Sequence, residues 1–232
     1  MTNATEQSSR VRFWTGAYSI TVLIVFLVLV LLGLVMRIGQ SGIAAVPPDL
    51  FYAIMTLHGL GMAGLLYTAG YAAIWYLSSK YVRPSVGLMG FNLALILLGV
   101  VGLIVATLIG RFGPGWYMLY PLPFMPTWPT WSIGLAVVSV MLLGVAWLLG
   151  QLDLLRAIAG RFGLSGMLGW QYLRKGETED ELPPVVLIVA ISMIAGAVTT
   201  IVGAVMLMLY IAQWLAPELQ FDALLMKNAV FL

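Results

Sequence analysis

The sequence predicts an all-α, polytopic membrane protein with five transmembrane helices. Of its 232 residues, 62% are hydrophobic and only 9% carry Asp, Glu, Lys or Arg side chains, a balance that excludes an ordinary soluble domain. The charged residues gather in clusters that leave long uncharged intervals. Each interval can hold the roughly 20 apolar residues that cross a bilayer, and none shows the strict alternation of a membrane β-barrel strand.

The helices follow from these intervals in chain order. They are expected at about 13–36, 50–78, 84–110, 131–151 and 183–215. The fourth uncharged interval begins with Pro-, Gly- and Trp-rich sequence, so its helix is placed near its end. The first apolar run is too long for the apolar region of a signal peptide and lacks a small-residue cleavage site, so we expect no cleavage there.

The connecting segments complete the organisation. Residues 1–12 form a polar N-terminal segment, and residues 153–181 are expected to be a solvated connector with a short helix near 152–162. Residues 218–232 form a C-terminal segment whose last residues are apolar, which favours burial against another chain.

Lys and Arg are distributed unevenly between the two sets of loops, which indicates the orientation. Eight of the eleven basic residues share one side: Arg10, Arg12, Lys80, Arg83, Arg156, Arg161, Arg174 and Lys175. Because basic loops stay in the cytoplasm, the N-terminus is expected inside, with residues 1–12 cytoplasmic. The net charge of +2 is therefore a topology signal and does not indicate a nucleic-acid partner.

The chain has a single histidine and no cysteine. His58 lies about eight residues into the second helix, or roughly 12 Å below the outer surface at 1.5 Å per residue. Ionisable groups within a membrane are expensive and mark functional sites, and neutral imidazole is a common metal ligand. His58 is thus a candidate axial ligand of a haem iron; the alternative is an interhelical hydrogen-bonding residue.

Two other features lie near the outer surface. The segment 111–129 contains five prolines and four Trp or Tyr residues, a composition typical of an interfacial aromatic belt. Arg37 ends the first helix on the same side. It is either a cation that reaches the interface or a charge partner for a haem substituent.

Three segments resemble subunit I of the haem-copper oxidases, the terminal oxidases that use cytochrome c or quinol. Met36-Arg37 and Phe51–Gly59 are similar to the family's first loop and second helix, with its Thr-x-His-Gly motif. Gly115–Leu122 resembles the outer Gly-Trp-x-x-Tyr-Pro-Pro-Leu loop, and Phe221–Phe231 resembles the segment before the sixth helix. The three occur in the family's order and spacing.

The resemblance implies a role for five residues. The matching histidine, His58, would bind the iron of a low-spin haem. Arg37 and Tyr52 would contact the macrocycle, while Trp116 and Tyr117 would lie beside the propionates. The fold would be part of the subunit I helical bundle, and the haem would be of A or B type.

The sequence also lacks metal ligands that the family has. Since His58 is the only histidine, the second low-spin ligand, the high-spin haem ligand and all copper ligands must lie elsewhere. The resemblance therefore implies the N-terminal part of a split subunit I, whose remainder is a second polypeptide that meets residues 218–232. Copper would be bound only in that partner, and this chain would not reduce oxygen alone.

The family's branches differ in their proton pathway. The second-to-third loop here carries Lys80 and Arg83 and no acid, unlike the A-type branch, whereas Arg37 is closer to the A-type pattern. The electron donor (cytochrome c, another copper or haem protein, or quinol) and proton translocation stay open. The expected setting is a prokaryotic plasma membrane, with further oxidase subunits as partners.

Two alternatives remain at the level of sequence. One is a fragment of a nitric oxide reductase, which shares the haem-ligand helix. The other is a non-catalytic membrane subunit that keeps the fold, with His58 only hydrogen-bonded.

Overall fold

The computed structural model describes residues 2–118, 121–170, 173, 182–219, 221–222 and 224, with side chains from Ser8 onward. Five of the helices described are long and apolar enough to cross a membrane. They are α1 (Thr2–Gln40), α2 (Pro48–Ser78), α3 (Val86–Ile104), α4 (Thr130–Met167) and α6 (Pro184–Leu215). The predicted all-α membrane bundle is confirmed.

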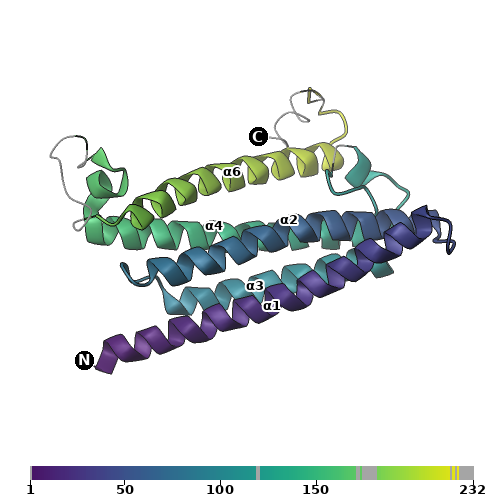
Figure 1. Ribbon diagram of the computed structural model, residues 1–232. Coiled ribbons are helices and arrows are strands. Elements are labelled where there is room, and N and C mark those ends of the chain that lie inside the picture. Colours follow the sequence, from purple (N-terminus) through teal and green to yellow (C-terminus); the bar gives the residue numbers. More distant parts are fainter. Residues whose placement is uncertain are drawn as a thin grey trace.

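The helices pack side by side, with α1 and α6 at opposite sides of the bundle and α2, α3 and α4 between them (Figure 1). The main pairings are α1 with α2, α3 with α4, and α4 with α6. The N-terminus lies at the same end of the bundle as the C-terminal end of α4 (Figure 1). This is the arrangement that the basic loops predict, because both segments then face one side of the membrane. We call the end of the bundle that carries the N-terminus the inner end, and the end at which α2 begins the outer end.

Helix α1 is longer than its apolar stretch. It begins at Thr2, so the helix includes most of the polar segment 1–12, and it ends at Gln40, beyond the expected residue 36. Only 6% of its most apolar 18-residue window is buried. This helix therefore offers most of its surface to lipid or to another protein.

Helix α3 changes form at its outer end. A π-helix, η1, covers Val105–Ile109, and the Gly110 amide donates to the Val105 carbonyl over 3.0 Å. Arg111 then adopts a left-handed conformation with φ +55°. The extra residue in this turn directs Phe112 into the interior, where it is fully buried and meets Trp128 edge-on at 5.5 Å between ring centroids. A π-helix of this kind commonly accompanies a functional site.

The helix expected near 152–162 is present as a continuation of α4, whereas the solvated connector expected from residue 153 onward is wrong for this first part. Helix α4 continues past Gln151 to Met167, with a kink at Gly163 where φ is +70°. Leu154 and Ile158, within this continuation, are fully buried. The charges at 153–161 end the apolar stretch but not the helix, because one face of α4 stays packed against its neighbours.

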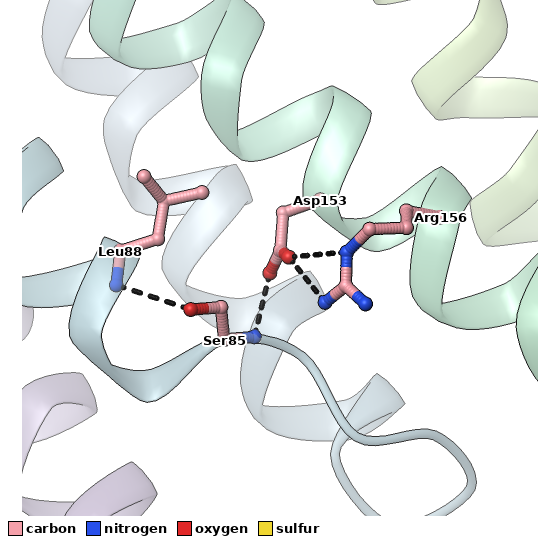
Figure 2. Close-up of polar contacts among 4 residues, drawn as sticks. All are labelled: Ser85, Leu88, Asp153 and Arg156. Carbon is pink, nitrogen blue, oxygen red and sulfur yellow. Dashed lines mark hydrogen bonds and ion pairs between the residues drawn. The ribbon is translucent and has the colours of Figure 1, made fainter.

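A buried acid joins this inner part of α4 to α3. Asp153 Oδ2 accepts the Ser85 amide at 2.7 Å, and Oδ1 accepts two bonds from the Arg156 guanidinium at 2.6 and 3.1 Å (Figure 2). Ser85 is the N-cap of α3, and its Oγ accepts the Leu88 amide. Asp153 therefore satisfies one of the free amides at the start of α3.

The interior consists of two main apolar clusters. The inner cluster gathers around Tyr18, Trp75 and Leu154, and the outer one around Leu57, Leu103 and Phe112. A short 3-10 helix, η2 (Leu122–Phe124), lies in the outer loop before α4. The outer cluster thus supports the loop 111–118 from below.

Candidate functional site

His58 is half-buried at the contact between α2 and α1. Its Nδ1 lies 2.8 Å from the main-chain carbonyl oxygen of Leu29 on α1. A carbonyl oxygen can only accept, so Nδ1 carries a proton, and in the neutral imidazole the lone pair is then on Nε2. No described residue forms a hydrogen bond with Nε2. The ring is thus held in the tautomer that can bind a metal through Nε2.

A glycine on α1 makes room for the ring. A Cβ added at Gly33 would lie 2.9 Å from His58 Cε1 and 3.6 Å from Nε2. Gly33 follows Leu29 by one helical turn, so the missing side chain leaves the Leu29 carbonyl open to the imidazole. Gly61, on α2, receives the Leu29 side chain in the same way, with Cδ2 at 2.6 Å from its Cβ position.

The hydroxyl of Thr56 ties the outer loop to α2. Thr56 is fully buried, donates to the Tyr52 carbonyl over 2.9 Å, and accepts the Gly115 amide at 2.9 Å. A hydroxyl can do both at once. The threonine of the Thr-x-His motif, two residues before His58, therefore attaches the outer loop to α2.

Two glycines let the loop lie directly on the helix. A Cβ at Gly113 would meet the backbone nitrogen of Ala53 at 3.0 Å, and one at Gly59 would meet Trp116 Cβ at 2.3 Å. Gly115 adopts φ +85°, a conformation that favours glycine. Trp116 consequently lies against Gly59, the residue that follows His58, and its ring contacts the Tyr117 ring in a tilted arrangement, with 3.9 Å between the centroids.

The remaining predicted site residues lie at the edge of this arrangement. Tyr52 is 53% exposed, and its backbone, not its ring, meets the loop. Arg37 is exposed, one turn beyond Gly33 on the same face of α1, and donates to Gln40 Oε1 at 3.0 Å. No described side chain links Arg37 to His58. The structure thus brings together His58, Trp116 and the Tyr52 backbone, with Arg37 on the neighbouring helix.

An exposed ion pair borders the site on its outer side. Arg111 Nε lies 3.5 Å from Asp49 Oδ2, with side chains 44% and 60% exposed. Such a pair contributes little stability. It does place the end of the π-helix beside the first turn of α2, and so at the level of the outer loop.

Sequence reasoning missed the residues that support the histidine. Leu29 acts through a main-chain carbonyl, which no side-chain pattern reveals, and Gly33 is one glycine among 25. Thr56 could have been identified from the sequence, because it is the threonine of the Thr-x-His-Gly motif.

The donor set fits a haem better than a bare metal ion. Among the described residues, no group of three His, Cys, Asp or Glu side chains converges. One imidazole with an unprotonated Nε2 suits an iron whose equatorial ligands come from a macrocycle.

Fold and site together define a multi-pass membrane protein with a candidate axial histidine on its second helix. A family model described as "Cytochrome C and Quinol oxidase polypeptide I" matches residues 14–231. The chain belongs to this family, and the family predicted from the motifs is confirmed. No match was found among curated proteins or among solved structures.

Proposed function

We propose that this chain holds one side of the low-spin haem of a terminal oxidase, with His58 Nε2 as an axial ligand. The observation that carries the proposal is the bond from His58 Nδ1 to the Leu29 carbonyl, 2.8 Å long. This bond fixes both the tautomer and the ring orientation, as second-shell bonds do for metal-binding histidines. Membership in the oxidase family supplies the identity of the group.

The other site residues would surround the macrocycle. Arg37, one turn outward from the glycine beside His58, is the cation for a polar substituent of the haem. Tyr52 adds an aromatic ring on the first turns of α2. Trp116 and Tyr117 cover the outer edge, where the propionates would point, and the loop bond to Thr56 keeps them there.

A haem held by His58 would supply one-electron transfer between an outer donor and an oxygen-reducing centre. The donor would be cytochrome c, another copper or haem protein, or quinol. The chain's own contribution is to hold the iron rigidly and to limit access of water from the outer surface.

The residues that complete the enzyme lie outside 1–232. His58 is the only histidine in 1–232, so the second imidazole, the high-spin haem ligand and the copper ligands lie outside these residues. In this proposal a second polypeptide, which carries the rest of subunit I, supplies them. The segment 218–232 would contact that partner; most of this segment lies outside the described residues. The assembly would include further oxidase subunits in a prokaryotic plasma membrane, with the N-terminus inside. Proton release by the assembled complex during turnover would show whether electron transfer is coupled to proton translocation.

The experiment compares the chain alone with the chain co-expressed with a polypeptide that supplies the missing helices. Alone, we expect weak or five-coordinate haem binding and no oxygen consumption, because one imidazole cannot fill both axial positions. Together, we expect a six-coordinate low-spin spectrum and oxygen reduction. Tight six-coordinate haem in the chain alone would contradict the proposal. Metal analysis of the complex separates a copper oxidase from an iron-containing nitric oxide reductase.

A further inference from the structure

One cavity lies at the other end of the bundle from His58. It has a volume of about 310 Å³ and opens between the N-terminal part of α1 and the C-terminal end of α2. The residues that line it are Ser8, Val11, Arg12, Tyr76, Ser79, Lys80 and Arg83. Three of these residues are cations, three carry a hydroxyl group (two serines and a tyrosine), and none is acidic.

The cations in this cavity have no acidic partner among the residues whose side chains the structure describes. No described carboxylate lies within ion-pair distance of Arg12, Lys80 or Arg83. Three unpaired positive charges around one hollow repel one another, so an anion would lower the free energy of the arrangement.

Two of the cations are held in place by neighbouring groups. The guanidinium of Arg12 donates from Nη2 to Ser8 Oγ at 3.3 Å and from Nε to the Ser8 carbonyl at 3.4 Å. Lys80 Nζ lies 5.6 Å from the centroid of the Tyr76 ring, a cation–π contact. These contacts therefore keep the positive charges of Arg12 and Lys80 beside the cavity.

The position of the cavity along the membrane normal identifies the anion. Arg12 immediately precedes the first apolar stretch, and Lys80 follows the last turn of α2, so the cavity lies at headgroup level. Directly toward the membrane, α1 exposes Phe13 and Ile20, which are 66% and 61% exposed. A phosphate in the cavity would thus have an apolar surface beside it on the membrane side, as the acyl chains of a lipid require.

We propose that this cavity binds the phosphate headgroup of an anionic phospholipid on the inner face of the membrane. The arginines and Lys80 bind the phosphate by charge-assisted hydrogen bonds, the Ser8 and Ser79 hydroxyls bind the polar headgroup, and the acyl chains lie along α1. The lipid then links α1 to the loop after α2. Basic pockets between helices on the cytoplasmic side recognise such headgroups.

The test is a titration of the full chain, purified in its complex, with phosphatidylglycerol or phosphatidylcholine in detergent, read by native mass spectrometry. We expect the first phosphatidylglycerol to bind more tightly than phosphatidylcholine. Lys80→Gln and Arg12→Gln should each weaken phosphatidylglycerol binding about fivefold. If Lys80→Gln or Arg12→Gln disturbs a helix end, Arg83→Gln tests phosphatidylglycerol binding independently.

The matched control is Arg10→Gln, which removes the same charge from the same helix two residues away, outside the cavity. Its lipid affinity should stay close to that of the unmodified chain. An equal loss in Arg10→Gln would mean a diffuse basic surface and would overturn the proposal, as would equal affinity for the two lipids. Displacement of the lipid by millimolar inorganic phosphate, but not by chloride of equal ionic strength, would assign the cavity to a soluble phosphate instead. Release of another subunit from the variants, with lipid binding unchanged, would assign it to a protein contact.

Discussion

His58 Nδ1 and the Leu29 carbonyl oxygen are 2.8 Å apart, so α1 fixes the orientation of a ring that α2 carries. The carbonyl is reachable because Gly33, one turn further along α1, has no side chain to cover it. The position of the imidazole thus depends on a stretch of bare backbone in a neighbouring helix. A substitution that leaves His58 intact can therefore still alter its ligation.

Gly33→Ala tests this dependence. The new Cβ would lie 2.9 Å from His58 Cε1, so the ring or the helix must move. Overpacking of this kind costs about 1–3 kcal/mol, which corresponds to about 5- to 150-fold weaker haem retention. The measurement is the amount of low-spin haem that the assembled complex retains per chain as it is diluted.

Gly16→Ala serves as the control, because it makes the same change in the same helix where nothing lies within 4 Å. Both variants gain the same helix propensity, so their difference isolates the contact with His58. Equal haem retention in the two variants would refute the role of Gly33.

Thr56→Val tests the attachment of the outer loop. It removes the acceptor of the Gly115 amide with little change in volume, and an unsatisfied buried amide costs about 1–3 kcal/mol. The loop should open about 5- to 150-fold more often, and trypsin added outside should cleave after Arg111 faster by a similar factor. Thr56→Ser, which keeps the hydroxyl, should cleave at the unmodified rate. A Val variant as resistant as the Ser variant would show that the bond does not restrain the loop.

The membrane spans could be predicted because hydropathy is a local property of the chain. The ends of α1 and α4 could not, because charges at the membrane surface end the apolar stretch without ending the helix. His58 could be singled out because it is the only histidine and the expected spans contain no Asp, Glu, Lys or Arg. Its orientation could not, because the acceptor is a main-chain carbonyl, a group that every residue has.

Asp153 is expected to stabilise the inner end of the bundle. Its side chain is 4% exposed and bonded both to the start of α3 and to Arg156, so Asp153→Ala should lower the free energy of unfolding by about 1.5–3 kcal/mol. Arg156→Gln should have a smaller effect, because that side chain is 64% exposed. Thermal unfolding in detergent compares the two. An Arg156 variant less stable than the Asp153 variant would reverse this assignment.

The orientation predicts which segments a membrane-impermeant reagent can reach. Tags at the N-terminus and within 171–181 should be protected in intact cells, because eight of the eleven basic residues lie on that side. A tag at Gly42, in the turn between α1 and α2, should react from outside; nothing packs against this glycine. Labelling of the N-terminus in intact cells would invert the orientation.

The most direct test of the account is His58→Met in the assembled complex, followed by electron paramagnetic resonance and redox titration of the low-spin haem. If His58 Nε2 binds the iron, the bis-imidazole signal should be replaced by that of an imidazole–thioether pair or be lost. Where the thioether binds, the midpoint potential should rise, because Met ligation favours the reduced iron. An unchanged low-spin signal with an unchanged midpoint potential would contradict the assignment of His58 as the axial ligand.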